Sequence, residues 1–279
     1  MHAPPSRPTV VRFAGHGGDE VQALFQSANS EGRASALVLV QEAFGIDPHI
    51  ATMVERFAGA GFTVIAPDLF TREGRALRRE PRIAKDGQLS GWGVPLSRKG
   101  KEDSAAPWSV DEIRGAVASL PDRRVLGDLE GALAHLARDQ QVDAGALGAV
   151  GFCMGGNYAL LLGCTSRRLR AVVDFYGRFI YAELGANKPI QPLEMILNLS
   201  VPLLAIFGEQ DPSISSVDIE RLRKMLEQSA KEHSIVTFPG VGHGFLNDRR
   251  KSYDRAAAEQ AWKLAVDFLR EHVVPSRAP

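Results

Sequence analysis

The stretch from Val150 to Asn157, which reads VGFCMGGN, limits the possible folds of this chain more than any other segment. An apolar run with small residues interspersed, 146–150, leads into it. The run 158–162 that follows has the apolar density of a buried helix. The pattern therefore predicts a strand, a sharp turn and a helix, with Cys153 at the tip of the turn.

The glycines around Cys153 indicate a nucleophile elbow. Such a turn holds its central residue in a strained backbone conformation, and the positions two before and two after it must be small. Gly151 and Gly155 occupy those positions. The turn also directs backbone N–H groups and a helix N-terminus at its tip, which favours a thiolate and an oxyanion. The alternative is a buried structural cysteine, the common fate of a lone Cys, and the surrounding glycines argue against it.

Length and composition fit one large α/β domain as well as two small ones, and they favour a small-molecule partner. A chain of 279 residues with 44% hydrophobic content can bury a full core. Lys plus Arg and Asp plus Glu are equal at 33 each, so no net field attracts nucleic acid or an anionic membrane. We therefore expect neither nucleic acid nor membrane as a partner.

The cysteines and the tails favour a reducing, cytoplasmic setting. Cys153 and Cys164 make no disulfide scaffold, and no Cys/His cluster suggests zinc. Residues 1–8 lack the apolar core of a signal peptide, and no run approaches the ~18 apolar residues of a membrane span. We expect residues 1–8 and 274–279 to be frayed tails. The oligomeric state stays open, with a homodimer as one option.

Strand patterns alternate with helical patterns along most of the chain. This alternation predicts an α/β fold in which a mostly parallel central sheet carries helices on both faces, built as a single domain over residues 1–279. A hairpin is expected at a sheet edge, from 9–13 and 21–25. Further strands are predicted at 36–40, 62–66, 146–150, 169–177, 202–208 and 234–238, and helices at 49–59, 126–138, 218–229 and 253–271.

The alternation breaks down between residues 71 and 124. Glycines, prolines and charge clusters interrupt the pattern there, which is typical of an insertion or a lid. Trp92, Trp108 and Arg98 stand out in this segment, where ordinary packing or a solvated surface competes with ligand contact. Outside it, we expect the histidines that lie in helix or linker patterns to be at the surface: His49, His135, His233 and His272.

Three functional groups fall in the loops after three successive predicted strands, in the order Cys153, Asp211, His243. Nucleophile, acid and base follow one another in this order in hydrolases with such an elbow. A free cysteine is only a few per cent thiolate at neutral pH, so a base must take its proton. His243, in a glycine-rich loop, can do so, and Asp211 can accept the ring N–H and fix the tautomer.

The segment 41–45, QEAFG, follows the continuous apolar run 36–40. Ligands of open parallel sheets bind beyond the carboxyl ends of the strands. Glu42 is therefore predicted to lie at the same edge of the sheet as the three groups above.

The chain resembles the dienelactone hydrolase family. The motifs that carry the resemblance follow one another in family order over most of the chain: QEAFG at 41–45, APDLF at 66–70, GDLE at 127–130, GFCMGG at 151–156, FYG at 175–177, GEQD at 208–211 and GHGF at 242–245. The resemblance implies a Cys-His-Asp triad that hydrolyses esters or lactones of small, often anionic, enol-type substrates without a metal or cofactor.

The resemblance also assigns roles beside the triad. In similar enzymes the residue at Glu42 contacts the resting thiol, and a carboxylate there would raise the thiol pKa and guard it from oxidation. The alternative is that Glu42 only binds loop amides. The backbone N–H groups of Ala43 and Met154 would form the oxyanion hole.

Substrate recognition departs from the family pattern. Members that act on dienelactone hold its carboxylate with an Arg and a Tyr one helical turn apart, and residues 71–124 contain no tyrosine. A further family arginine would fall on Asn247. The substrate-binding candidates are therefore only indicated, and they are Phe44, Trp92, Arg98, Tyr176, Phe245 and Arg249.

The sequence as a whole predicts a hydrolase that cleaves a lactone or small carboxylic ester through an acyl-enzyme on Cys153. A general carboxylesterase or thioesterase with another acyl group is the nearest alternative. A non-catalytic ligand receptor is a second, because fold alone does not give function. A redox sensor built on Cys153 is a third, which the absence of a C-x-x-C pair weakens.

Overall fold

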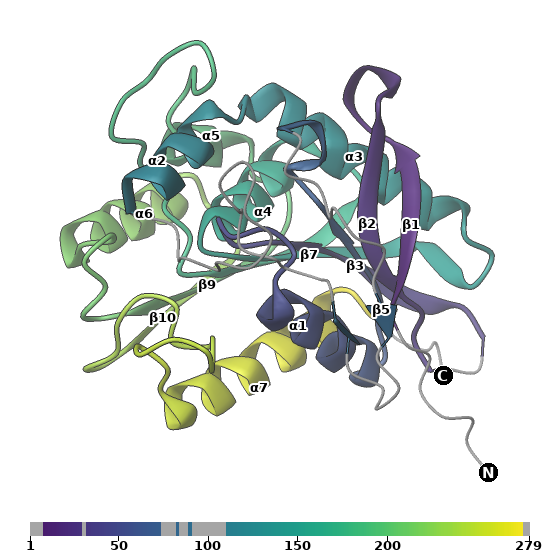
Figure 1. Ribbon diagram of the computed structural model, residues 1–279. Helices are drawn as coiled ribbons and strands as arrows, with labels where there is room; N and C mark the ends of the chain where they lie inside the picture. The colour runs from purple at the N-terminus through teal and green to yellow at the C-terminus, as the bar shows by residue number, and fades with distance from the viewer. Residues whose placement is uncertain (1–7, 30–31, 74–81, 84–88, 91–109, 276–279) are drawn as a thin grey trace.

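A computed structural model of the chain describes residues 8–29, 32–73, 82–83, 89–90 and 110–275. Its centre is a sheet of 8 strands in the order β1-β2-β4-β3-β7-β8-β9-β10 (Figure 1). The strands of this sheet are β1 Thr9–Ala14, β2 Glu20–Gln26, β3 Ala34–Val40, β4 Thr63–Pro67, β7 Val142–Phe152, β8 Leu169–Phe175, β9 Leu203–Gly208 and β10 His233–Phe238. The short strands β5 Arg82–Ile83 and β6 Leu89–Ser90 pair separately.

The sheet is mostly parallel, as predicted. Only the β1–β2 hairpin, at one edge, runs antiparallel to its neighbours. Strands β3 and β4 are buried along their whole length, which is why both read as continuous apolar runs rather than alternating ones. Because β4, β3, β7, β8, β9 and β10 all run the same way, their carboxyl ends meet at one edge of the sheet.

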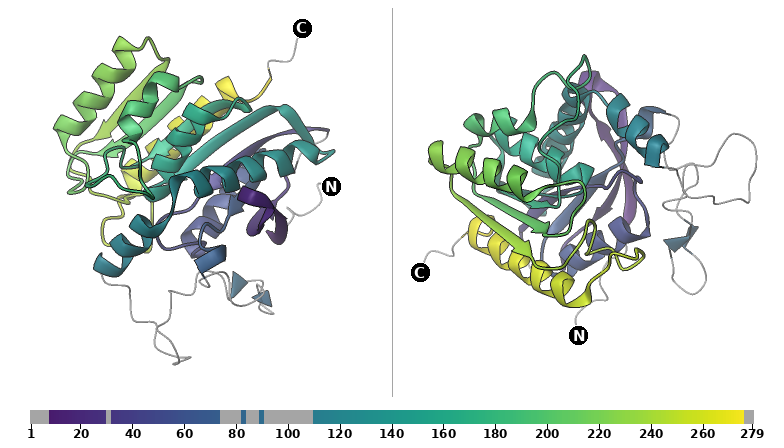
Figure 2. Two further views of the ribbon diagram at one scale, coloured as in Figure 1. Left: turned by 90° about the horizontal axis from the view of Figure 1, so that it is seen from above. Right: turned by 90° about the vertical axis from the view of Figure 1, so that its left-hand side faces the viewer.

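Helices cover both faces of the sheet (Figures 1 and 2). One face carries α1 and α7, and the other carries α3, α4 and α6. The helices are α1 Pro48–Gly59, α2 Val110–Ser119, α3 Asp122–Arg138, α4 Met154–Thr165, α5 Pro192–Met195, α6 Ser216–Gln228 and α7 Arg255–His272, with short 3-10 turns η1 His16–Gly18, η2 Thr71–Glu73 and η3 Ile196–Asn198. None of the helices in the described ranges is long and apolar enough to cross a membrane.

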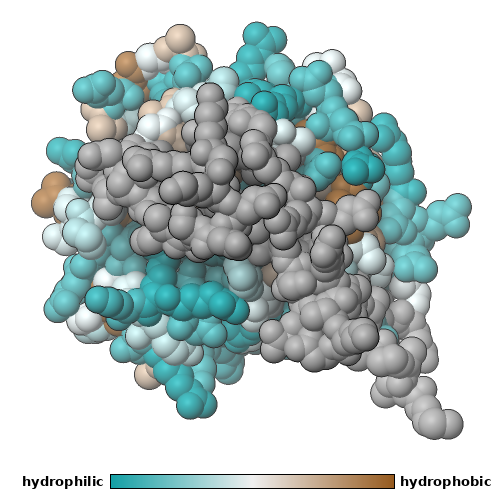
Figure 3. Space-filling model, viewed as in Figure 1, coloured by the Kyte–Doolittle hydropathy of each residue, from teal (hydrophilic) through white to brown (hydrophobic). Residues whose placement is uncertain are grey.

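The sequence explains where the helices begin. The Asp47 side chain accepts a hydrogen bond from the Ile50 N–H and precedes a proline, so it caps α1. Ser215 and Asp218 form a capping box at the start of α6. In contrast, α4 is buried on every side from Met154 to Cys164, because it is held between the sheet and the elements outside it. The surface shown in Figure 3 is mostly hydrophilic where the structure describes it.

One expectation needs correction and another stays a prediction. Most of the insertion predicted at 71–124, including Trp92, Arg98 and Trp108, lies outside the described residues, and its last part contains α2 and the start of α3. The prediction of a surface position for His49 is wrong, because its side chain is 1% exposed. His49 lies in the first turn of α1, and its ring packs edge-on against Phe152, 5.7 Å between centroids, at the end of β7.

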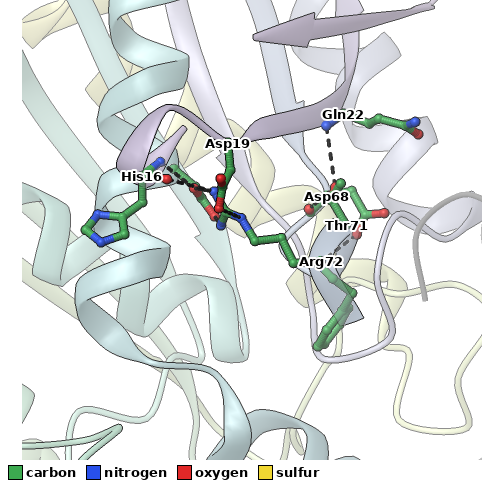
Figure 4. A network of polar contacts seen from close by, with 8 residues as sticks. His16, Asp19, Gln22, Asp68, Thr71 and Arg72 are labelled. Carbon is green, nitrogen blue, oxygen red and sulfur yellow. Dashed lines mark hydrogen bonds and ion pairs between the residues drawn. The ribbon is translucent and has the colours of Figure 1, made fainter. Parts of the chain in front are cut away.

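A polar network fixes the segment that follows β4 (Figure 4). The Arg72 guanidinium binds Asp128 of α3, with Nη1 2.6 Å from Oδ2, and Asp19 of the hairpin, with Nε 2.9 Å from Oδ2. It also donates to the His16 carbonyl at 3.2 Å. A Cβ on Gly127 would lie 2.5 Å from the His16 ring, so α3 needs a glycine where the hairpin tip crosses it. The network therefore anchors three segments that lie far apart in the sequence.

Candidate active site

The turn between β7 and α4 has the geometry of a nucleophile elbow. Cys153 has φ 54° and ψ −117°, a strained conformation for a residue with a side chain. A Cβ on Gly151 would lie 1.9 Å from the Gly155 carbonyl oxygen, and one on Gly155 would lie 2.2 Å from the Val40 carbonyl oxygen. The glycines therefore let α4 begin directly against the ends of β7 and β3, with the thiol at the tip.

The structure brings Cys153, His243 and Asp211 into one row of hydrogen bonds. The His243 Nε2 atom lies 3.1 Å from Cys153 Sγ, and its Nδ1 atom lies 2.6 Å from Asp211 Oδ2. The second oxygen of Asp211 accepts a hydrogen bond from the Ser213 N–H at 2.7 Å, which fixes the carboxylate. The three residues come from the ends of β7, β9 and β10, where the sequence places them.

The electrostatics of the row favour a charged imidazole. Burial by itself lowers the pKa of His243, but the negative charge of the Cys153 sulfur and the hydrogen bonds to Asp211 and Cys153 outweigh burial and raise it from 6.5 to about 10. The row can therefore hold a protonated imidazole beside the Cys153 sulfur, ready to donate a proton to a leaving group.

The raised pKa of His243 predicts the alkaline limit of activity. Asp211 and Cys153 stabilise the protonated ring of His243. Their contribution to the stability of the fold is therefore complete below pH 6.5 and disappears as the pH rises through about 10. We expect kcat/KM for ester hydrolysis to fall above about pH 10, because the ring then has no proton for the leaving group. Initial rates from pH 6 to 11, with circular dichroism to confirm the fold at each pH, measure this limit. An alkaline limb centred near pH 7 would contradict the raised pKa of His243.

Glu42 lies at the same edge of the sheet, completely buried after β3. Its Oε2 atom accepts hydrogen bonds from Asn247 Nδ2 and from Arg250 Nη2, each at 3.1 Å. Within the described ranges no hydrogen bond joins Glu42 to Cys153, whose sulfur faces His243. The carboxylate is thus held by side chains rather than by loop amides, and its control of the thiol stays a prediction.

Arg250 is a site residue that the sequence does not single out. Its guanidinium lies 4.5 Å from the centroid of the Phe44 ring, in addition to its ion pair with Glu42. A Cβ on Gly244, which has φ 74°, would lie 3.2 Å from the Arg250 side chain. The neighbouring candidate Arg249 has an exposed side chain and uses its backbone N–H to bind Asn247. The only available signal was the Arg-Arg pair itself, which does not say which member points inward.

Tyr176 forms a wall of the site beside His243. It has φ 45° and is completely buried, with its ring 5.2 Å from the His243 ring in an edge contact. Phe245 is also completely buried and packs behind it at 5.6 Å. Burial, with Glu42 and Cys153 nearby, raises the pKa of Tyr176 well above 10, so the phenol stays a neutral donor.

Both predicted oxyanion-hole amides lie beside the elbow. Met154 is the first residue of α4, and Ala43 follows Glu42 in the loop after β3. The elbow glycine Gly155 packs on the carbonyls of Val40 and Gln41, which brings the two loops together. Neither amide donates a hydrogen bond to another residue in the part of the chain that the structure describes, so both N–H groups are available to an oxyanion.

Fold and site together define an α/β-hydrolase of the carboxylic ester hydrolase class. The model of the "Dienelactone hydrolase family" matches residues 21–273, so this chain belongs to that family.

The chain has similar relatives among known proteins. It is 30% identical over 243 residues to "Putative carboxymethylenebutenolidase" of Escherichia coli (strain K12), covering 87% of this chain and 79% of that one. It is 30% identical over 246 residues to "Probable 2-oxo-3-(5-oxofuran-2-ylidene)propanoate lactonase" of Bradyrhizobium sp, covering 88% and 87%. Among solved structures, "Putative Dienelactone Hydrolase from Klebsiella pneumoniae subsp. pneumoniae MGH 78578" superposes with a TM-score of 0.78 at 25% identity, covering 96% of this chain and 100% of that one.

Proposed function

We propose that this protein hydrolyses a lactone or small carboxylic ester through a covalent acyl-enzyme on Cys153. One observation carries the proposal: the thiol at a strained elbow lies 3.1 Å from a histidine nitrogen whose other nitrogen lies 2.6 Å from a buried carboxylate. Nucleophile, base and orienting acid in such a row are the requirements for acyl transfer.

The geometry supports the following acylation step. The Cys153 thiolate attacks the carbonyl carbon and forms a C–S bond, while the carbonyl oxygen becomes an oxyanion facing the N–H groups of Ala43 and Met154. The oxyanion then collapses and the C–O bond to the leaving oxygen breaks. That oxygen takes the proton from the His243 imidazolium, which leaves a thioester on Cys153 and a neutral imidazole.

Deacylation reverses these roles. His243 removes a proton from a water molecule, the resulting hydroxide attacks the thioester carbonyl, and the C–S bond breaks. The carboxylic acid product leaves, and thiolate and imidazolium are restored. Asp211 keeps its hydrogen bond to Nδ1 throughout, so the ring holds the tautomer that both steps need. With a lactone, the leaving oxygen stays tethered to the acyl group as a hydroxyl or enol.

The side chains around the row favour a substrate that carries an anion. Arg250 is a half-buried cation held by Glu42 and by the ring of Phe44. A substrate carboxylate can replace one of these partners with a charge-assisted hydrogen bond. The relative from Bradyrhizobium is named for a substrate that is both a furanone lactone and a propanoate, which agrees with a carboxylate close to the scissile ester.

We expect Arg250→Gln to raise KM for an anionic lactone by roughly 10- to 100-fold, because a hydrogen bond to a charged group contributes about 1.5–3 kcal/mol. KM for a neutral aryl ester should change little. The experiment compares cis- and trans-dienelactone, a neutral aryl ester and an acyl thioester as substrates. Lys251→Gln, which removes an exposed positive charge next in sequence, is the matched control.

The three possible outcomes of this substrate panel support or reject different parts of the proposal. Turnover of the lactones with the expected KM change supports the whole proposal. Turnover of only the neutral ester or thioester would keep the mechanism and reject the anionic substrate. If wild-type protein hydrolysed no member, the proposed function would be wrong and a ligand receptor would be favoured.

A further inference from the structure

Besides Asp211 and Glu42, the site contains a third buried carboxyl group, which the proposed chemistry does not use. Asp174 lies in β8, in register with Gly151 of β7 and Ala205 of β9, and is 1% exposed. The two strands that flank it therefore end in the loops that carry Cys153 and Asp211. The strand pattern of the sequence gives no hint that this position is special.

The Asp174 carboxyl group fills a space that two glycines leave open. Its Oδ1 atom accepts a hydrogen bond from the Gly177 N–H at 2.7 Å. A Cβ added to Gly156 would lie 2.0 Å from Oδ1, and one added to Gly177 would lie 2.3 Å from it. Gly156 belongs to the first turn of α4, so the carboxyl group touches both the helix that follows the nucleophile and the turn that follows β8.

The turn that Asp174 closes holds both reacting groups. The Phe175 carbonyl accepts a hydrogen bond from the Cys153 N–H at 2.9 Å. Tyr176 has φ 45°, a conformation that needs outside support, and its ring packs on His243. Displacing the turn would therefore move the nucleophile and the base together.

Burial destabilises the charged form of a carboxyl group at this position. Burial raises the pKa of Asp174 from 3.8 to about 7, although the Gly177 N–H and the positive charge of His243 both act to lower it. An asparagine could accept the same hydrogen bond from Gly177 without a buried charge. The hydrogen bond to Gly177 alone therefore does not explain the carboxylate, whose charged form the nearby positive charge of His243 favours.

We propose that Asp174 is a positioning residue of this active site: its carboxylate holds the turn of Phe175–Gly177 against the elbow and stabilises the charged form of His243. This inference rests on the proposed function, because it assigns Asp174 to the same nucleophile and base. Asp174 acts through these residues and does not touch the substrate.

The two roles of Asp174 predict opposite effects of removing its charge. The pKa of Asp174 is higher in the folded protein than its ordinary value of 3.8, so its contribution to stability is complete below that value and is lost as the pH rises through about 7. Asp174→Asn should therefore raise Tm relative to wild type, by more at pH 8 than at pH 5. The same variant should lower activity at pH 8, because His243 loses a favourable charge.

The test uses Asp174→Asn and Asp174→Ala in a Cys164→Ala background, so that iodoacetamide reports Cys153 alone. Three quantities are measured: Tm at pH 5 and 8, kcat and KM on the best substrate of the panel, and the alkylation rate from pH 5 to 11. For Asp174→Asn we expect a higher Tm at pH 8, a kcat lower by about 10-fold and a KM within twofold of wild type. The high-pH change in the alkylation rate, which reports deprotonation of His243, should shift to lower pH. Asp174→Ala should lose further kcat, because it also loses the Gly177 hydrogen bond.

The control is Asp143→Asn, the same substitution at the exposed start of β7, where Asp143 Oδ1 accepts a hydrogen bond from the Gly145 N–H at 2.9 Å. It should change none of the three quantities. Unchanged kcat and an unchanged alkylation profile in Asp174→Asn would overturn the inference, as would a kcat loss that is matched by a lower Tm at pH 8. The alkylation profile needs no substrate, so it decides on Asp174 even if the panel were to reject the proposed function.

Discussion

Cys153→Ala is expected to lower kcat for ester or lactone hydrolysis by at least ~10³-fold, since losing a nucleophile that acts together with its base removes the acyl-enzyme route. The fold should remain, because alanine is smaller than cysteine at a position where the strain lies in the backbone. Rates on the best substrate of the panel, with Tm as the check on folding, measure the effect.

The chain supplies a matched control in its other cysteine. Cys164 lies in the same helix, α4, is 8% exposed, and has its pKa raised to about 12 by burial, so it is no nucleophile at neutral pH. Cys164→Ala should keep kcat within twofold of wild type. If Cys153→Ala kept wild-type turnover, or if Cys164→Ala lost it, another group would be the nucleophile.

Gly155→Val is expected to have the largest effect on stability. The Cβ position lies 2.2 Å from the Val40 carbonyl oxygen and 2.5 Å from that of Gln41, both backbone atoms that no side-chain rotation can move away. Forcing α4 away from β3 should cost more than ~3 kcal/mol of the free energy of unfolding, above the usual range for overpacking in a core, because backbone atoms have to move. Any folded remainder should have lost activity, because the elbow and the Ala43 loop would separate.

Gly59→Ala is the control for this substitution. Gly59 is the last residue of α1, and a Cβ there meets nothing within 4 Å. Its effect should be neutral or stabilising by up to about 1 kcal/mol, as expected for replacing glycine at a helical position. Chemical denaturation of both variants beside wild type gives the comparison. A Gly155→Val protein with wild-type stability would show that strand and helix do not pass as closely as described.

Much of the site could be read from the sequence because its signals are local. The glycines at 151 and 155 mark the elbow, and the loops after apolar runs mark the positions of Asp211 and His243. The ends of the strands are harder to predict from the sequence. β7 begins at Val142, four residues before the apolar run, because Asp143 and Gly145 are polar or small at the exposed start of the strand.

What the sequence did not reveal depends on contacts between distant segments. Arg250 reaches Glu42, 208 residues earlier in the chain, only because the loop after β10 folds back over the end of β3. Asp174 occupies an ordinary strand position in the sequence. Only in the folded protein does it contact Gly156 and Gly177, and these contacts place it beside the site. His49 looked like a surface helix residue because the pattern of α1 does not show that its first turn packs against Phe152.

The central claim is that Cys153 carries the acyl group, and the most direct test is intact-mass spectrometry of the enzyme quenched with acid during turnover of a slow aryl ester. The account predicts a mass increase equal to one acyl group, on the peptide that contains Cys153. The increase should persist in Cys164→Ala and be absent in Cys153→Ala. Turnover without any adduct on Cys153, together with an acyl group on another residue, would contradict the account.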